Sequence, residues 1–211
     1  MVARPPSRNY QKHTNPNPLQ RWLIRRFHER IAEMLGQALG IDASPDHRRG
    51  TGRTVLDVGC GEGFVAAYLQ DRFPNLTILG VDIDFRFLGT ACTGRAYFVG
   101  ADARALPFSE ETFDLVLCLE VLEHLEKPRE ALAELARVSR GLVLLSVPHQ
   151  PFFSLANLLR GKNLTCGGDD PDHRHRWRPG QFLALLEGMG RVERLTYAFP
   201  WVIALVRKGS I

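Results

Sequence analysis

The sequence predicts an α/β protein with a Rossmann-like, doubly wound sheet of seven strands. The sheet is expected to be mostly parallel with an antiparallel C-terminal strand, and to carry helices on both faces. From Arg53 onward, short β-branched runs alternate with helical stretches, as in the repeated βα units of a parallel sheet. The last two strand-like runs, 192–197 and 201–206, are separated by a few residues only, which allows a hairpin and excludes a parallel crossover.

Each element of this domain is indicated by its own run of residues. The first five strands are expected at 54–58, 76–81, 96–99, 113–119 and 141–147. The helices between and after them are expected near 63–72, 84–92, 128–138 and 182–189. These elements make up one domain over residues 54–211, in which 148–180 form an insertion before the last helix.

Two segments precede the domain. Residues 1–18 hold four prolines among polar residues and are expected to be mobile, because they cannot bury enough surface to offset the entropy of ordering. Asn17 and Pro18 then have the form of a helix N-cap and a proline at the first helical position, and apolar residues recur at helical spacing as far as Gly40. Residues 19–53 are therefore predicted to form an amphipathic helix and a polar linker.

The positive charge of the chain lies at its front. The net charge is +4, but residues 1–53 carry +6 and residues 54–211 carry −2. The polar side of the N-terminal helix holds Arg21, Arg25 and Arg30, with Arg26 beside them. We favour a helix that packs on the domain with a solvated arginine face over a lid or membrane-surface helix. An anionic phosphate, an anionic lipid and plain solubility all stay open as reasons for the charge.

Composition and cysteine usage predict a cytoplasmic protein. Of the 211 residues, 45% are hydrophobic and 24% charged, which is typical of an ordinary globular domain. The longest apolar runs have the length of strands, well short of the roughly 18 residues of a membrane span, and the polar N-terminus shows no secretory signal. The four cysteines, Cys60, Cys92, Cys118 and Cys166, form no C-x-x-C pair, so we expect free thiols.

The strongest local signal is the segment VLDVGCGEGF at residues 55–64. Its alternating glycines, Gly59, Gly61 and Gly63, allow a ligand to approach backbone N–H groups, and the helix that follows offers partial positive charge at its N-terminus. A dinucleotide-binding loop has the spacing G-x-G-x-x-G, so the third glycine comes one residue early here. Asp57, just before the loop, suits a ligand that bears an ammonium group.

Acidic side chains follow the next three strands. Asp82 stands twenty-three residues after Gly59, the spacing at which a carboxylate accepts ribose hydroxyl groups in nucleoside-binding α/β folds. Asp84 fits a helix N-cap better. Asp102 ends the third strand, where it can accept a hydrogen bond from an adenine amino group. The fourth strand leads into LEVLEHL at 119–125, a cluster of two acids and a histidine.

In this order and spacing, these four elements resemble the class I S-adenosylmethionine-dependent methyltransferases, specifically the methyltransferase type 11 group that includes ubiquinone- and menaquinone-biosynthesis enzymes. The resemblance is close over residues 54–147. It implies S-adenosyl-L-methionine as the cofactor, S-adenosyl-L-homocysteine as the product and in-line displacement of the methyl group. The cofactor contacts that it implies are Asp57, Gly59 and Gly61 for the methionine part, Asp82 for the ribose, Ile83 for the adenine ring, Asp102 and Ala103 for its amino edge, and Leu119 and Glu120 at the methionine end.

The chemistry also calls for a base when the acceptor is an alcohol or a phenol. The sulfonium of the cofactor makes the methyl group electrophilic without a metal, so the protein has to orient the acceptor, exclude water and receive its proton. Histidine titrates closest to neutral pH. His149 and His124 follow strands at the edge where ligands bind in open α/β sheets, and they are the candidate catalytic residues.

The insertion at 148–180 is expected to enclose the acceptor. Its last part mixes cationic, aromatic and imidazole groups, and His175, Trp177 and Arg178 are the candidate substrate-binding residues. His173 and His175 form a His-x-His pair, which is a weak metal signal without further ligands nearby. We therefore predict no metal site.

The expected partner is a small-molecule acceptor, lipid-linked or quinone-like, with S-adenosylmethionine as cofactor. The alternatives are an RNA methyltransferase, favoured by the basic front, and a non-catalytic regulator with a methyltransferase fold. Enzymes that methylate amino groups of DNA have an Asn/Asp-Pro-Pro-aromatic tetrad after the fourth strand. Residues 119–122 read LEVL instead, which counts against this class of enzyme. The glycine spacing counts against an NAD-dependent dehydrogenase. We expect no nucleic-acid partner and no transmembrane segment, and leave open a peripheral membrane contact through the N-terminal helix and the oligomeric state.

Overall fold

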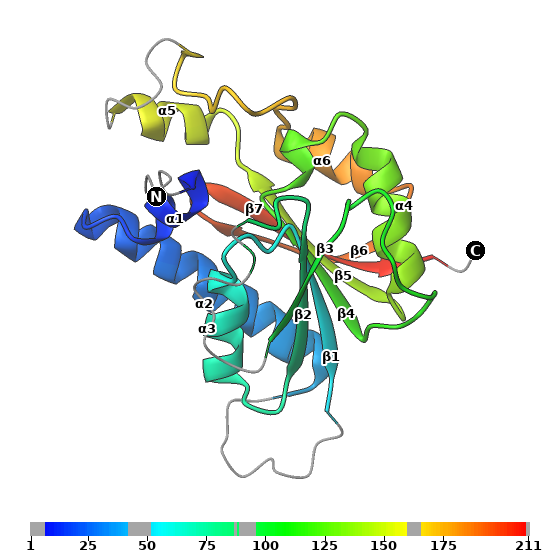
Figure 1. The fold of residues 1–211 in the computed structure, drawn as a ribbon. Helices are drawn as coiled ribbons and strands as arrows, with labels where there is room; N and C mark the ends of the chain where they lie inside the picture. The colour runs from blue at the N-terminus through cyan, green and yellow to red at the C-terminus, as the bar shows by residue number, and fades with distance from the viewer. Residues whose placement is uncertain (1–6, 42–51, 87, 89–95, 160–165, 210–211) are drawn as a thin grey trace.

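Seven strands form one sheet in the order β3-β2-β1-β4-β5-β7-β6 (Figure 1). The computed structural model describes residues 7–41, 52–86, 88, 96–159 and 166–209. The parallel strands are β1 (Thr54–Val58), β2 (Thr77–Asp82), β3 (Tyr97–Gly100), β4 (Leu115–Leu119) and β5 (Leu142–Pro148). β6 (Gly190–Ala198) and β7 (Trp201–Lys208) form a hairpin, and β7 runs antiparallel to β5. The predicted fold class is confirmed.

The order of the strands creates a switch point between β1 and β4. The chain moves outward from β1 through β2 to β3, then returns to β4 on the other side of β1. Val58 pairs with Val81 of β2 and with Cys118 of β4, so the loops after these three strands begin at the same level. Such a switch point is where open α/β sheets bind their ligands.

One face of the sheet is covered by α2 (Pro18–Leu39) and α3 (Phe64–Arg72). α2 begins as predicted, because the Asn17 side chain accepts hydrogen bonds from the N–H groups of Leu19 and Gln20, and it ends at Gly40 in the left-handed conformation. Its apolar stripe, which includes Phe27 and Ile31, is buried against the strands. The amphipathic helix therefore packs on the domain, which is the interpretation that the sequence favoured.

The opposite face is covered by α4 (Pro128–Val138) and α6 (Pro179–Leu186), with the 3-10 turn η1 (Leu122–His124) ahead of α4. Leu135 and Phe182 are fully buried there against apolar strand residues. Because β4 and β5 are buried on both sides, their residues are apolar almost throughout. The expectation of helices on both faces is confirmed.

Three elements differ from the sequence expectation. The helix expected at 84–92 is not described: Phe85 and Arg86 lie in a turn, and 87 and 89–95 are outside the described residues. The last helix begins at Pro179, earlier than expected, because proline occupies its first turn and Gln181 accepts from the Arg178 N–H. Residues 1–18, expected to be mobile, contain a short helix, α1 (Arg8–His13).

α1 and α5 (Phe152–Leu159) both lie at the carboxyl ends of the strands, where Figure 1 shows them above the sheet. The Ser7 side chain caps α1 by accepting from the Tyr10 N–H. The ring of His13 stacks on Phe64 at a centroid distance of 4.4 Å, so α1 packs on the first turn of α3. The contacts of α1 with the domain supply order that the composition of this segment does not predict.

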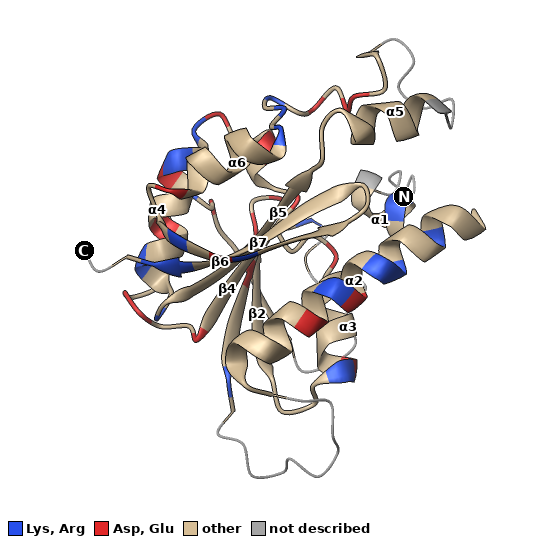
Figure 2. Cartoon of the chain, turned by 180° about the vertical axis from the view of Figure 1, so that it is seen from behind, with Lys and Arg blue, Asp and Glu red and all other residues tan. Residues whose placement is uncertain are grey.

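The basic residues of α2 lie on its outer side, where Figure 2 shows them interspersed with acidic ones. Arg25 pairs with Glu29 at 3.7 Å and Arg30 with Glu33 at 2.7 Å. These exposed pairs contribute little stability. They do offset part of the positive charge that the sequence places on this helix.

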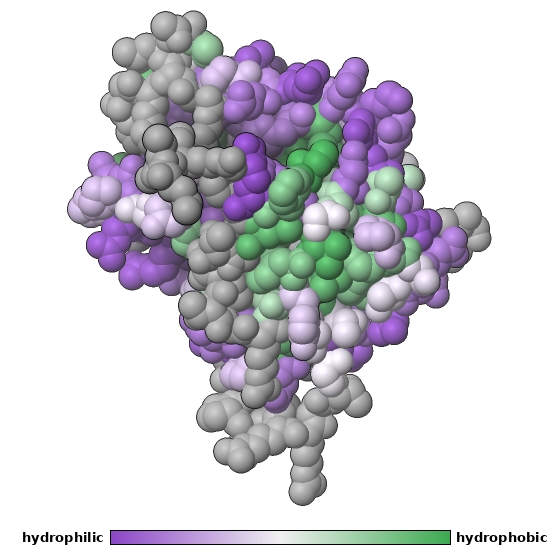
Figure 3. All heavy atoms as spheres, in the orientation of Figure 1, coloured by the Kyte–Doolittle hydropathy of each residue, from purple (hydrophilic) through white to green (hydrophobic). Residues whose placement is uncertain are grey.

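Hydrophobic residues gather in the middle of the face on which β3 lies (Figure 3). Large exposed side chains at the end of β2 and along β3 are Ile83, Phe85, Tyr97 and Val99. No helix within the described ranges is long and apolar enough to cross a membrane. Three of the four cysteines are described and have free thiols, as predicted, while Cys92 lies outside the described residues.

Candidate active site

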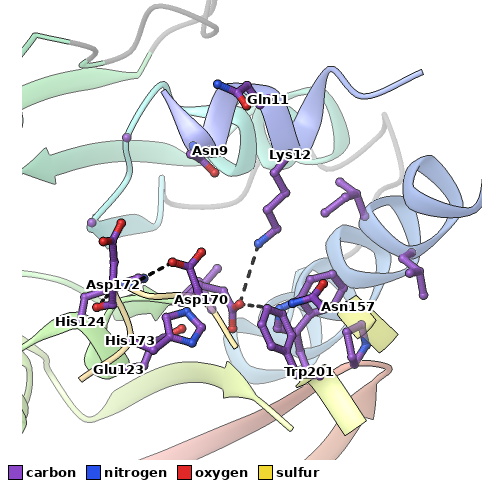
Figure 4. Close-up of a pocket in the computed structure, with 18 of the residues that line it drawn as sticks. Asn9, Gln11, Lys12, Glu123, His124, Asn157, Asp170, Asp172, His173 and Trp201 are labelled. Atoms are coloured by element: carbon purple, nitrogen blue, oxygen red, sulfur yellow. Dashed lines mark hydrogen bonds and ion pairs between the residues drawn. The ribbon is translucent and has the colours of Figure 1, made fainter. Parts of the chain in front are cut away.

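A cavity of about 580 Å³ opens at the carboxyl ends of β1, β2 and β4 (Figure 4). Helices α1, α2 and α5, the start of β7 and the loop before α6 complete its wall. The residues that follow the parallel strands and line it are Gly59, Gly61, Asp82, Leu119, Glu120, Glu123 and His124. Five of the seven are among the predicted cofactor contacts, and His124 is one of the two predicted catalytic residues.

The glycine loop after β1 is held tightly against its neighbours. Gly59 has φ +77°, and a Cβ atom there would lie 2.2 Å from Cγ2 of Val121. The N–H groups of Gly59 and Cys60 both donate to the carbonyl oxygen of Val81, at 2.7 and 3.1 Å. Glycine is therefore required both for the backbone conformation and for the close approach of the segment after β4.

Asp82 joins the end of β2 to the same loop. Its Oδ2 accepts from the Gly61 N–H at 2.9 Å, and its Oδ1 accepts from the Asp84 N–H at 2.8 Å. Each carboxylate oxygen can accept a second hydrogen bond. Because Asp82 lines the cavity, it can order the loop and still accept hydrogen bonds from a ligand.

Asp57 lies in β1 beneath the loop and does not line the cavity. Its side chain is 3% exposed, and its Oδ2 has no hydrogen-bond partner among the described residues. Burial, together with the charge of Asp82, raises the pKa of Asp57 to about 7. This unpartnered oxygen and the loop at Gly59 suit an amino-acid ligand. The ammonium of such a ligand would offset the charge of Asp57, and the loop N–H groups would bind its carboxylate.

The other predicted cofactor contacts lie outside the cavity wall. Ile83 follows β2 with 71% of its surface exposed, so an adenine ring could pack against it. Asp102 follows β3, and its carboxylate accepts hydrogen bonds from Nε and Nη2 of Arg104. This guanidinium holds the pKa of Asp102 below its ordinary value. Ala103 packs at the edge of the second apolar core.

Glu120, after β4, is held in a strained conformation. It has φ +60°, a region that residues other than glycine enter at some cost. Its Oε2 accepts from Nε1 of Trp201 and lies 3.8 Å from Nζ of Lys12, and its Oε1 accepts from Oγ of Ser146 at 3.4 Å. Burial raises the pKa of Glu120. Figure 4 shows Lys12 extending from its helix into the cavity, with a dashed line at its ammonium group.

Glu123, His124 and His173 form a second group, which we call the Glu–His–His cluster. One side-chain ligand atom from each lies within 4.8 Å of the others. The N–H groups of Arg174 and His175 donate to the carbonyl oxygen of Glu123 at 2.8 and 3.1 Å, which brings the loop before α6 onto η1. Burial lowers the pKa of His173 to about 4. The cluster joins two segments that are far apart in the sequence.

The carboxyl group of Glu123 is buried, and no hydrogen bond within the described residues offsets its loss of contact with water. Its side chain is 1% exposed, and neither Oε1 nor Oε2 has a hydrogen-bond partner within the described part of the chain. Burial and the charge of Glu120 raise its pKa well above the ordinary value. A buried carboxyl without a partner is costly, so such a group is usually functional.

The remaining predicted site residues do not line the cavity. His149 follows β5, but its ring packs against Phe152 and Tyr197 at centroid distances of 4.9 and 5.2 Å. Nε2 of His175 lies 2.9 Å from the carbonyl oxygen of Leu125, and its ring stacks on Trp177. Arg178 is exposed and precedes α6. The contact of His175 with Leu125 holds the loop beside the end of η1. The predicted catalytic role of His149 and the predicted substrate contacts of His175, Trp177 and Arg178 stay predictions.

A comparison with protein families matches residues 56–145 to the family described as "Methyltransferase domain". This stretch contains the glycine loop, Asp82, Asp102 and the segment after β4. Over these residues the chain is similar to that family.

The curated relatives also match less than half of the chain. An uncharacterised methyltransferase of Mycobacterium tuberculosis is 40% identical over 101 residues, which are 45% of this chain and 39% of that protein. The chain thus spans about two fifths of the length of the curated relatives it matches. Their names do not specify the quinone-biosynthesis subgroup, which stays a prediction.

Solved structures with a similar fold cover nearly the whole chain. A Pyrococcus horikoshii protein is similar with a TM-score of 0.66 and 18% identity, covering 97% of this chain and all (100%) of that one. The magnesium protoporphyrin IX methyltransferase of Synechocystis, crystallised with bound S-adenosylhomocysteine, gives a TM-score of 0.65 and 19% identity, covering 96% and 92%. At these identities the likeness shows the fold.

Several residues at the glycine loop and the cavity were not predicted as part of a site. Oε1 of buried Glu62 accepts from Oγ of Ser7, and its Oε2 accepts from Nδ2 of Asn9 at 2.6 Å, which ties α1 to the glycine loop. Lys12 and Trp201 reach the cavity from α1 and β7. Glu62 in the loop and the polar residues of α1 were visible in the sequence, but no spacing rule connects segments 53 residues apart.

Proposed function

We propose that the protein transfers a methyl group from S-adenosylmethionine to a small-molecule acceptor of the lipid-linked or quinone-like kind. One observation carries this proposal: a single cavity is bounded by the glycine loop and Asp82 on one side and by the Glu–His–His cluster on the other. A cofactor held at the loop would share this space with an acceptor at the cluster. Proximity and orientation are the main contributions that such a site has to make.

The cofactor would be held by residues that the fold already positions. Asp57 and the loop at Gly59 and Gly61 suit the amino-acid part, and Asp82 suits the ribose hydroxyl groups. S-adenosylmethionine supplies an electrophilic methyl group when bound. Leu119 and Glu120 line the same cavity and come just before the cluster along the chain, so they would line the path between the methyl donor and the acceptor.

The chain itself has to exclude water and receive the acceptor's proton. α1 and α5 lie over the cavity and restrict access to it. Of the two predicted catalytic histidines, only His124 lines the cavity, where it lies with Glu123 and His173. This group of three is therefore where an acceptor hydroxyl would be oriented and lose its proton.

The electrostatics of the cavity favour a small acceptor over RNA. Its charged lining residues are one lysine, Lys12, and five acids, Asp82, Glu120, Glu123, Asp170 and Asp172. An RNA backbone would need cations at such a site. Leu23, Ile24 and Phe153 add apolar surface that suits a ring or an isoprenoid chain.

Exposed apolar side chains beside the cavity support a lipid-linked acceptor and a peripheral membrane contact. Phe152 and Leu155 of α5 and Leu19 and Trp22 of α2 are all close to half exposed. Arg21 lies between the last two. Apolar side chains interspersed with arginine are typical of helices that lie on anionic membranes.

The proposed activity is tested by the release of S-adenosylhomocysteine. Purified protein would be supplied with S-adenosylmethionine and, separately, with phenolic quinone precursors, lipid-linked acceptors in vesicles, and transfer or ribosomal RNA. We expect release with a phenolic or lipid-linked acceptor and none with RNA. Release with RNA alone would establish the alternative substrate class, and cofactor binding without release in any arm would favour the non-catalytic alternative.

Cofactor affinity is expected to depend on pH through Asp57. The cofactor's ammonium favours ionised Asp57, whose pKa of about 7 in the empty protein means that the competent form is lost as the pH falls. Affinity should therefore drop about tenfold between pH 8 and pH 6. Asp57→Asn should bind the cofactor more weakly, and its affinity should not change with pH between pH 8 and pH 6. Calorimetry measures both effects. An unchanged pH profile in Asp57→Asn would contradict this role.

A further inference from the structure

We propose that the Glu–His–His cluster binds one divalent transition-metal ion, with Oε of Glu123 and ring nitrogens of His124 and His173 as ligands. The sequence predicted no metal site because it considered only the pair His173-x-His175. The structure separates that pair, since His175 contacts a backbone oxygen, and gives His173 two new neighbours from η1. One carboxylate and two imidazoles are a ligand set for ions such as Zn²⁺, Mn²⁺ or Fe²⁺.

The unpartnered carboxyl of Glu123 is the observation that points to a ligand. The side chain is buried, it takes part in the cluster, and both of its oxygens have no hydrogen-bond partner within the described residues. A polar group in that position costs free energy unless something pairs with it. A cation bound by this carboxylate would compensate for its burial.

The orientation of His124 suits metal binding. Its Nδ1 lies 3.2 Å from the carbonyl oxygen of Asp172. When Nδ1–H donates to this carbonyl, Nε2 is left as the lone-pair nitrogen. Metal-bound histidines commonly have this arrangement, because a hydrogen bond at the second nitrogen fixes the tautomer and the ring.

The spacing and the charge around the cluster allow an ion to be held. The three ligand atoms lie within 4.8 Å of one another, so small side-chain rotations would bring each to a bond length of about 2.1 Å. Asp170 and Asp172 also line this part of the cavity, and Glu120 is close enough to affect the pKa of Glu123. The local potential is negative and attracts a cation.

An ion with three protein ligands keeps open positions that face the cavity. An acceptor oxygen could bind there, and the metal would lower the pKa of a bound hydroxyl. This consequence rests on the proposed function, whereas binding of the ion does not. His124 would then act on the acceptor through the ion rather than as a free base.

The proposal is tested by calorimetric titration of the chelator-treated protein with Zn²⁺ and with Mn²⁺. We expect one ion per chain. Glu123→Gln and His173→Gln should each weaken binding at least about 100-fold, since even residues that only orient a ligand commonly contribute 10- to 100-fold. His149→Gln, which changes a histidine at the same sheet edge outside the cavity, should bind like the wild type. No binding at micromolar ion, or equal binding by all three variants, would overturn the proposal.

Two further measurements keep the test decisive. Without metal, the melting temperature of Glu123→Gln should equal or exceed that of the wild type, because a neutral amide replaces a buried carboxyl without a partner. Added metal should raise the melting temperature of the wild type only. If Glu123→Gln does not fold, the partly exposed His173 provides the variant that decides. Titration of the same metal-free protein with S-adenosylhomocysteine tests the proposed function separately. Failure of metal binding therefore does not imply failure of cofactor binding, and the reverse holds too.

Discussion

Replacing Asp82 with alanine is expected to weaken the binding of S-adenosylhomocysteine about 100-fold. If Asp82 binds the ribose as proposed, the substitution removes two hydrogen bonds from hydroxyl groups to a charged acceptor, which together are worth about 3 kcal/mol. It also frees the Gly61 N–H, which Asp82 now holds at 2.9 Å. Calorimetric titration of the variant and of the wild type measures the loss.

Two neighbouring variants separate the role in binding from the role in ordering the loop. Asp82→Asn keeps one side-chain oxygen, which can still accept from the Gly61 N–H. It has no charge and no second oxygen for the two ribose hydroxyl groups, so we expect an intermediate loss of affinity of about tenfold. Asp84→Asn removes a partly exposed acid two residues away, which pairs with Arg86, and should leave the affinity within about twofold of the wild type. Wild-type affinity in Asp82→Ala would rule out the assigned ribose contact.

Replacing Gly59 with alanine is expected to abolish detectable cofactor binding and to lower stability. The new Cβ atom would meet Val121 Cγ2 at 2.2 Å, and an L residue at φ +77° is strained. Overpacking of this kind costs about 1–3 kcal/mol in the free energy of unfolding. Chemical denaturation and calorimetry measure the two effects on the same protein.

Gly180 provides a matched control for this substitution. It lies in the first turn of α6, and a Cβ atom there would have no neighbour within 4 Å. Gly180→Ala should therefore be neutral or slightly stabilising, because alanine is the better helix former. Adding Val121→Ala to Gly59→Ala removes the clashing atom and should recover part of the lost stability. If Gly59→Ala is as stable as the wild type and binds the cofactor, the close fit of this loop is not required.

The parts of the site that follow strands along the chain could be predicted from the sequence. The loop at Gly59 and the acid at Asp82 lie at the ends of two neighbouring strands. The alternating glycines mark the end of β1 in the sequence, and the apolar run of β2 marks its end at Asp82. Parallel strands that pair in register place their following residues at one edge, so Asp82 and Glu120 had to approach the loop. Local sequence signals suffice where topology brings consecutive loops together.

Contacts between distant segments could not be predicted in this way. Lys12 reaches Glu120 because α1 packs on α3 through His13 and Phe64, and helix periodicity does not show where a polar N-terminal segment docks. His124 and His149 both follow strands, yet only His124 lines the cavity, because the ring of His149 packs against aromatic neighbours. Side-chain direction after a strand depends on packing that one sequence does not show.

Titration of the wild-type protein with S-adenosylhomocysteine tests most directly the claim that this cavity is a methyl-transfer site. The structure provides one loop of the required kind and one cavity beside it in the described residues. We predict that one molecule binds per chain and that binding is lost in Gly59→Ala. Absence of any heat of binding at millimolar ligand, with a folded protein in the cell, would contradict the account.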